Sequence, residues 1–136
     1  MAPLADTGFL LAVLANDDPR HEVCVETLRR EPQILVCDVV LPELAYLVLR
    51  DLNHRMLATF LRSVGVGRVT YLSTTRAELV RAADLIEQYA DARIDFVDCV
   101  IVAMAERLNI TRILSVDRRH LTMIRPKHCA YFEILP

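Results

Sequence analysis

The chain has 136 residues, of which 54% are hydrophobic, and its formal net charge at pH 7 is −2. This length and composition suit one domain that buries a full core, and the charge excludes the strongly basic proteins that coat nucleic acid without selectivity. The longest apolar runs, residues 9–15 and 99–105, are far shorter than the roughly 20 residues of a membrane-spanning helix, and no basic stretch precedes the first run. We therefore expect a cytoplasmic protein with no membrane partner.

Short apolar segments alternate with amphipathic segments along the chain. The short segments predict strands at residues 3–5, 34–37, 69–72, 112–116 and 130–135. The amphipathic segments, and one that is apolar on nearly every side, predict helices at residues 7–15, 19–30, 39–51, 53–64, 76–89 and 96–108. Strands that alternate with helices predict an α/β fold with a mainly parallel sheet and helices on both faces.

Polar residues mark several of the expected helix starts. Asp17 and Asp18 are candidate N-caps in front of Pro19, a residue suited to the first helical turn. Asp38 is expected to cap the helix after the second strand, and the hydroxyl residues 73–75 to cap the helix after the third.

Two carboxylates directly follow predicted strands. Asp6 comes after the first strand and Asp117 after the strand at residues 112–116. In open α/β sheets the ligand site lies beyond the carboxyl ends of the strands, so both acids are candidate site residues. The alternative is that both are turn residues, because aspartate accepts hydrogen bonds from the backbone of a turn.

Two further carboxylates fall within helical segments. Glu43 lies three residues after Val40 and four before Leu47, so we expect it on the inward face of its helix. The alternative is an acid of the first turn, close to Pro42 and favoured by the helix dipole.

The second of these acids, Asp98, lies in the most apolar helix of the chain, which argues for a buried helix. Its alternative is a capping box, in which Asp95 is the N-cap and Asp98 the reciprocal acid three residues later. Both roles are compatible, because a capped helix end would also hold Asp98 in one orientation.

Together, the four acids predict a metal site. Burying an ionised carboxylate is costly unless it is paired, hydrogen-bonded or bound to a cation. A hard ion such as Mg²⁺ takes oxygen ligands, and without it the mutual repulsion of the acids would raise at least one pKa. Neither a serine-hydrolase motif nor a glycine-rich phosphate loop is present. The residues favour a metal-dependent enzyme that acts on a phosphoryl group.

The order of these residues resembles a known family. The matching segments are residues 4–8 (LADTG), 41–46 (LPELAY), 95–99 (DFVDC), 103–108 (AMAERL) and 113–120 (ILSVDRRH). The chain resembles PIN-domain ribonucleases over essentially its whole length, particularly the VapC toxins of VapBC toxin–antitoxin pairs. This resemblance implies a three-layer α/β/α sandwich, formed by residues 1–136 as one nuclease domain, and an endoribonuclease that depends on Mg²⁺ or Mn²⁺.

The resemblance also implies roles for individual residues. The catalytic and metal-binding acids would be Asp6, Glu43, Asp98 and Asp117. Thr7 would either support the first aspartate or cap a helix, and Asp95 would be secondary or capping. The candidate RNA contacts are Arg118, Arg119 and His120, with solvated surface charge as the alternative. His120-Leu121 departs from the family, in which many members have an acid and then phenylalanine.

Partners follow from the same resemblance. They are an RNA substrate and a small VapB-like antitoxin whose disordered tail folds over the acids. A homodimer is also expected, although core burial would equally explain the apolar residues concerned, which are Leu44, Leu47, Val48, Leu57 and Leu61. The rival functions are a catalytically weak PIN-like module that binds RNA or protein, and a phosphoacceptor receiver domain. The latter lacks a lysine at the end of a late strand, since Lys127 follows Pro126 in a basic segment.

Overall fold

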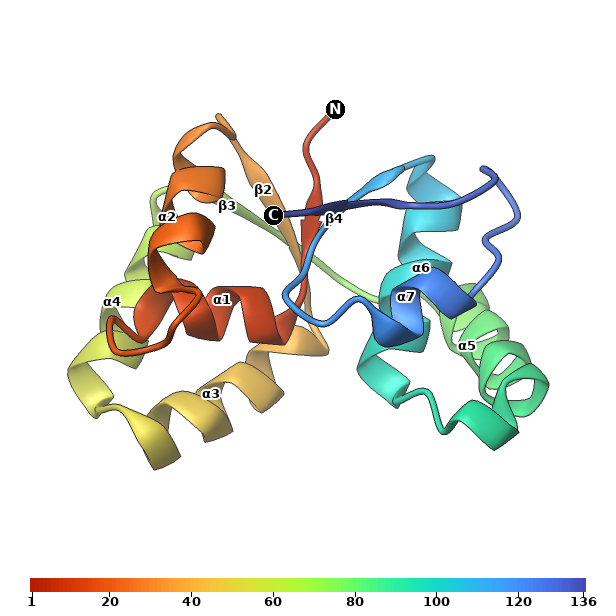
Figure 1. The fold of residues 1–136 in the computed structure, drawn as a ribbon, viewed down its shortest axis with the longest axis horizontal. Coiled ribbons are helices and arrows are strands. Elements are labelled where there is room, and N and C mark those ends of the chain that lie inside the picture. The colour runs from red at the N-terminus through yellow and green to blue at the C-terminus, as the bar shows by residue number, and fades with distance from the viewer.

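A five-stranded sheet separates two groups of helices in the computed structural model, which describes residues 1–136 (Figure 1). The spatial order of the strands is β3-β2-β1-β4-β5, and every neighbouring pair is parallel. The strands are β1 (Leu4–Ala5), β2 (Ile34–Cys37), β3 (Val69–Leu72), β4 (Arg112–Leu114) and β5 (Glu133–Leu135). The predicted parallel sheet is therefore confirmed.

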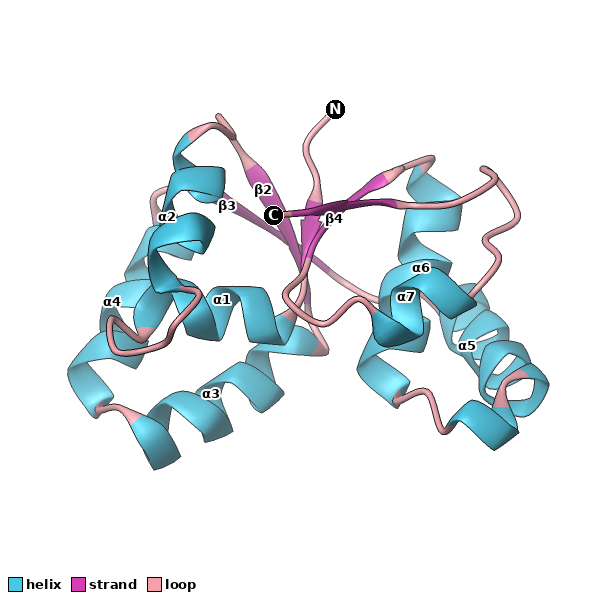
Figure 2. Cartoon of the chain, viewed as in Figure 1, coloured by secondary structure: helices cyan, strands magenta, loops and turns pink.

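Helices cover both faces of this sheet, as Figures 1 and 2 show. On one side lie α1 (Thr7–Leu14), α2 (His21–Arg29), α3 (Val40–Asp51) and α4 (His54–Gly65). On the other side lie α5 (Arg76–Gln88), the short 3₁₀ helix η1 (Ala90–Ala92), α6 (Phe96–Leu108) and α7 (Arg119–Met123). This arrangement is the predicted α/β/α sandwich. None of these helices has the length and apolar character that crossing a membrane requires.

The central strand β1 brings distant parts of the chain to one edge of the sheet. Leu4 and Ala5 are fully buried, and Ala5 lies beside Leu114 of β4. The pairing continues one residue further, where the Asp6 amide donates to the Leu114 carbonyl at 3.0 Å. The strand order changes direction between β1 and β4, and such switch points form the crevice in which α/β proteins bind ligands.

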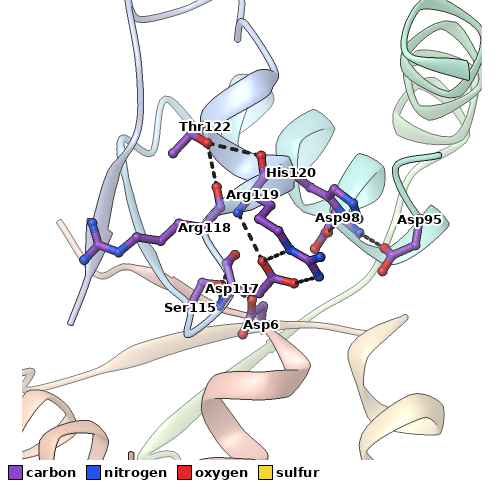
Figure 3. Close-up of polar contacts among 9 residues, drawn as sticks. All are labelled: Asp6, Asp95, Asp98, Ser115, Asp117, Arg118, Arg119, His120 and Thr122. Carbon is purple, nitrogen blue, oxygen red and sulfur yellow. Dashed lines mark hydrogen bonds and ion pairs between the residues drawn. The ribbon is translucent and has the colours of Figure 1, made fainter. Parts of the chain in front are cut away.

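Helix α6 is the buried helix that its composition predicts. All seven residues from Cys99 to Ala105 are buried, and α6 packs against α5 and α7. The helix begins at Phe96, after Asp95, and ends at Leu108, and Asn109 after it has the left-handed conformation that often follows a helix C-terminus. Its first turn points toward the carboxyl edge of the sheet and so carries Asp98 to the crevice (Figure 3).

Three candidate caps are wrong, because Arg20 and not Asp17 or Asp18 is the N-cap of α2, and Val39 and not Asp38 is the N-cap of α3. Asp18 accepts a hydrogen bond from the Arg20 amide at 2.8 Å in the turn before α2, which therefore begins at His21. Asp38 is not the cap of α3. Its carboxylate instead accepts from the amide of Thr74 at 3.0 Å and from the Thr74 hydroxyl, and so ties the end of β2 to the end of β3. Asp18 therefore stabilises a turn, and Asp38 connects the ends of two neighbouring strands.

Other boundaries agree with the sequence patterns or differ by a few residues. Thr75 caps α5 and forms a complete capping box with Glu78. The strand at β4 ends at Leu114, earlier than expected, because the chain turns at Ser115 toward the crevice. The last strand begins only at Glu133.

Candidate functional site

A cavity of about 310 Å³ lies at the carboxyl edge of the sheet, beside the ends of β1 and β4. Its lining comes from the start of α1, from α3, from the start of α6 and from the segment that leads into α7. All four predicted acids take part. The lining residues are Asp6, Thr7, Gly8, Glu43, Leu47, Asp95, Val97, Asp98, Asp117, Arg119 and His120. The fold therefore brings together acids that are up to 111 residues apart, from Asp6 to Asp117.

Asp6 is held rigidly at the base of this cavity. Its side chain is only 7% exposed, caps α1 by accepting from the Phe9 amide at 2.8 Å, and accepts a second hydrogen bond from the Ser115 hydroxyl. Burial raises the pKa of Asp6 to about 6, against these two hydrogen bonds, and Asp117 and Asp95 add to the rise. Neither lysine nor arginine pairs with it, so near neutral pH its charge favours an added cation.

Asp98 stands in the first turn of α6 and faces His120 of α7. Its Oδ2 lies 3.1 Å from His120 Nδ1, as Figure 3 shows. Burial raises the pKa of Asp98 to about 7, and the charge of Asp95 raises it further, while the hydrogen bond from His120 opposes the rise. The repulsion expected among the acids is thus present, but desolvation is the larger cause.

Asp95 is the N-cap of α6, as one of its two predicted roles requires. Its Oδ1 accepts from the Asp98 amide at 2.8 Å. The reciprocal bond of a capping box is not formed, because the Asp98 carboxylate turns to His120 instead. The capping-box interpretation is therefore only half right, and it leaves the Asp98 carboxylate facing the cavity.

Asp117 differs from Asp6 and Asp98 because it is already paired with a positively charged side chain, that of Arg119. Arg119 donates to it from the backbone amide at 3.1 Å, from Nε at 3.1 Å and from Nη2 at 2.9 Å (Figure 3). The Arg119 side chain holds the pKa of Asp117 down to about 2, so this acid stays ionised. The guanidinium is 80% exposed, and an ion pair this exposed exchanges partners at little cost.

The other predicted RNA contact, Arg118, points away from the acids in Figure 3. Its guanidinium donates to the carbonyl oxygen of Pro136 at the end of the chain. Of the two arginines, only Arg119 lines the cavity.

Glu43 is exposed, so its expected inward position is wrong. The inward stripe of α3 consists of Val40, Leu44 and Val48, which are spaced four residues apart and fully buried. Glu43 stands beside this stripe, at the wall of the cavity, and its carboxylate makes no hydrogen bond in the structure. It can therefore reach a ligand in the cavity without losing a partner. Of the apolar residues named for a homodimer, Leu61 of α4 is exposed, whereas Leu44 and Val48 of α3 belong to the core.

Thr7 is the first residue of α1, and Asp6 is the cap, so the capping alternative for Thr7 is wrong. The Thr7 side chain is buried, and its Oγ1 has no hydrogen-bond partner. A buried hydroxyl without a partner is costly, which points to a water or ligand in the cavity that it lines. Oxygen donors of this kind, together with four carboxylates, fit a hard divalent cation.

Two contacts of the site were not predicted from the sequence, the bond of Ser115 to Asp6 and that of His120 to Asp98. Ser115 is buried and joins Asp6 to the turn before Asp117, and a polar residue between Leu114 and Val116 in a predicted strand was the only signal for it. The contact between His120 and Asp98 had no signal, because it depends on how α7 packs on α6. Gly8 also matters, since a Cβ there would lie 3.2 Å from Cγ2 of Val116.

Known proteins are similar to this chain in both sequence and fold. Residues 4–124 match the PIN domain family. The chain is 31% identical to Ribonuclease VapC26 of Mycobacterium tuberculosis over 134 residues, which cover 98% of this chain and 99% of that protein.

Among solved structures, VapC20 of Mycobacterium tuberculosis, a toxin that cleaves the sarcin–ricin loop, matches with a TM-score of 0.84 at 19% identity, over 99% of this chain and all of that one. VapBC2 of Rickettsia felis, bound to a DNA fragment from its promoter, matches with a TM-score of 0.73 at 14% identity, over the whole length of both chains. These two structures share the fold with this chain. The family match along residues 4–124 and the 31% identity to Ribonuclease VapC26 show that the chain belongs to the PIN-domain family, among its VapC-type members.

Proposed function

We propose that the protein is an endoribonuclease that depends on a divalent cation, Mg²⁺ or Mn²⁺, and acts as the toxin of a type II toxin–antitoxin pair. The observation that carries this proposal is the cavity in which Asp6 and Asp98 are desolvated beside other acids without an arginine or lysine partner. The similarity to a protein named as a ribonuclease supports RNA as the substrate. Residues 1–136 would act as one nuclease domain in the cytoplasm.

Four carboxylates would hold the cation. Asp6 is positioned by the Phe9 amide and the Ser115 hydroxyl, and Asp98 by its place in the first turn of α6. Glu43 approaches from α3 on another wall, and Asp117 from the end of β4. A bound divalent cation polarises a phosphoryl oxygen and lowers the pKa of water, which is the chemistry that RNA hydrolysis needs.

Asp117, in addition to its place near the cation, and Arg119 would bind and orient the reactants. Asp117 is ionised at any physiological pH, so it can accept a hydrogen bond from the attacking water and hold it in line with the scissile bond. Arg119 is exposed and can exchange Asp117 for a phosphate of the RNA, which it can bind in a bidentate manner. The Asp6 carboxylate, fixed by two hydrogen bonds, keeps its orientation during this exchange.

An antitoxin partner is part of the same proposal. A toxin–antitoxin complex from Klebsiella pneumoniae has the same fold, with a TM-score of 0.70. The bidentate contact of Arg119 with Asp117 supports the idea that an arginine of an antitoxin tail fits among these acids. A homodimer would cover exposed apolar side chains of α3 and α4, namely Tyr46, Leu49 and Leu61, and light scattering on the purified chain would measure it.

The test is cleavage of fluorescence-quenched RNA and of total cellular RNA by the purified protein. We expect cutting with Mg²⁺ or Mn²⁺ and none with chelator, because the carboxylates alone offer no group that polarises the phosphate. Equal cutting in chelator would refute the cation dependence. A folded protein that binds both cations and cuts neither RNA would support the rival, a catalytically weak binding module.

A further inference from the structure

We propose that His120 is itself a ligand of the cation, so that this cavity offers a mixed imidazole and carboxylate donor set and binds Mn²⁺ in preference to Mg²⁺. The inference rests on the proposed function, because it concerns the same cavity. It adds a residue outside the four acids, on α7, and predicts which ion the site selects.

The positions of three side chains support this role. One ligand atom from each of Asp95, Asp98 and His120 lies within 4.8 Å of the other two. Nδ1 of His120 is 3.1 Å from Oδ2 of Asp98. Metal–ligand bonds of roughly 2.1 Å place adjacent ligands of an octahedral ion about 3 Å apart. The spacing of the imidazole and the carboxylate therefore suits two ligands in one coordination shell, and Figure 3 shows Asp95 on the far side of Asp98 from Asp117.

The fold holds His120 in this position before any ion binds. The neighbouring side chain of Leu121 is buried in the core, and the Thr122 hydroxyl donates to the carbonyl of Arg118, the N-cap of α7, at 2.7 Å. Asp95 is fixed in turn by its bond to the Asp98 amide, which uses one of its two carboxylate oxygens. The three groups thus keep their spacing, and little side-chain entropy is lost when a cation binds.

A second observation points to a ligand at this place. The Thr7 hydroxyl lines the same cavity, is buried, and has no partner. His120 is the only histidine in the lining. Two others have backbone partners elsewhere, His21 at the Ala12 carbonyl and His128 at the Ile110 carbonyl. The fourth, His54, is exposed at the start of α4.

The donor set determines the preference among ions. Mg²⁺ is a hard ion that takes oxygen ligands and gives up water reluctantly. Imidazole nitrogen suits first-row transition ions better than it suits Mg²⁺, and among those ions Mn²⁺ is the one that, like Mg²⁺, also suits carboxylate and water ligands. With His120 as a ligand, the site should therefore favour Mn²⁺. With an aspartate in its place, the donor set would be all oxygen and the preference should fall.

The direct test is pulsed electron paramagnetic resonance on the protein loaded with one equivalent of Mn²⁺. We expect the nitrogen coupling of a coordinated imidazole, which ¹⁵N-labelled histidine should alter. The coupling should persist in His54→Ala, a matched control because His54 lies outside the cavity, and disappear in His120→Asp. The presence or absence of nitrogen coupling in the wild-type spectrum already tests whether a histidine coordinates the ion. The inference therefore stays testable even if a variant fails to fold.

Calorimetric titrations with Mn²⁺ and with Mg²⁺ give the second measurement. In His120→Asp we expect the Mn²⁺ affinity to fall roughly tenfold or more relative to the Mg²⁺ affinity. If His120 serves only as a counter-charge of Asp98, its replacement should change both affinities by the same factor, and that result would overturn the inference.

Failure of this inference can be told from failure of the proposed function. Bound Mn²⁺ without nitrogen coupling, combined with RNA cleavage that requires a cation, would overturn the role of His120 and leave the nuclease standing. Absence of Mn²⁺ and Mg²⁺ binding, combined with RNA cleavage that resists chelator, would overturn both.

Discussion

Between α5 and α6, two buried carboxylates are paired with arginines of the same chain. Glu106 is 10% exposed and binds Arg81 through two hydrogen bonds, of 2.8 and 3.1 Å, while Glu78 is 2% exposed and pairs with Arg107. The Arg81 side chain and the Lys127 amide lower the pKa of Glu106 in spite of its burial.

In the cavity, by contrast, two shielded acids are not paired with an arginine or a lysine. Asp6 and Asp98 have no arginine or lysine partner, and burial raises their pKa values to about 6 and about 7. Both regions obey the same rule, that a desolvated carboxylate needs a cation. The acids between α5 and α6 are paired with arginines of the same chain, whereas Asp6 and Asp98 in the cavity require a cation from outside.

The largest effect should follow from removing one acid of the cavity. We expect Asp98→Asn to reduce cation-dependent RNA cleavage by about 1,000-fold, because it removes a buried ligand of the ion. The fold should stay intact, since the change relieves the repulsion from Asp95. Initial rates of RNA cleavage and circular dichroism would test this, with Glu106→Gln as the matched control outside the cavity. Cleavage by Asp98→Asn at the wild-type rate would remove Asp98 from the site.

Replacing an acid between α5 and α6 should instead lower stability and leave RNA cleavage unchanged. Glu106→Ala would leave Arg81 desolvated without a partner and free the Lys127 amide, so we expect a loss of about 3 kcal/mol in the free energy of unfolding. Urea unfolding would measure the loss, and RNA cleavage by the folded fraction should not change. In the double variant with Arg81→Ala the loss should be smaller than the sum of the two single losses. A single-variant loss near zero would mean that this pair contributes nothing to the fold.

The metal-free protein should become less stable as the pH rises from about 4 to about 7. The pKa values of Asp6 and Asp98 lie above their ordinary value of 3.8, so between about pH 4 and pH 7 the folded state binds more protons than the unfolded state. The free energy of unfolding then falls through this window, and one pKa unit of difference between the folded and unfolded states corresponds to at most about 1.4 kcal/mol.

Urea unfolding of chelator-treated protein at several pH values would show this slope. Asp98→Asn should make it shallower, and saturating Mn²⁺ should restore stability at the alkaline end because the ion binds the ionised acids. A wild-type slope that rises with pH would contradict the assignment of these two groups.

The smallest effect should come from Arg119. Its pair with Asp117 is exposed, so Arg119→Ala should leave thermal stability nearly unchanged. Removing a positive charge beside the acids should raise cation affinity by roughly threefold, and the loss of a phosphate contact should raise KM for RNA. Calorimetry and steady-state kinetics would separate the two, with Arg118→Ala as the control because that side chain points away. Equal changes in cation affinity and in KM for Arg119→Ala and Arg118→Ala would mean that the net charge of the protein, and not the position of Arg119, causes them.

Most of the secondary structure could be predicted from local patterns. The bounds of β2, β3 and α6 match the expected ranges, because each is an apolar run with polar residues at its ends. The caps at Asp18 and Asp38 could not be predicted. An aspartate serves a turn, a cap or a cross-strand bond equally well, and its partner at Asp38 is Thr74, 36 residues away.

The candidate site, too, could be predicted from the sequence only in part. The order and type of the four acids, and their places after strands or in first turns of helices, are visible in the sequence, since the carboxyl ends of parallel strands must share one edge. Three features depend on how the elements pack: the exposure of Glu43, the hydrogen bond that spans 109 residues from Ser115 to Asp6, and the position of His120 beside Asp98. Local patterns encode which residues are buried or capped, but contacts between distant side chains arise only when helices and strands pack around a common core.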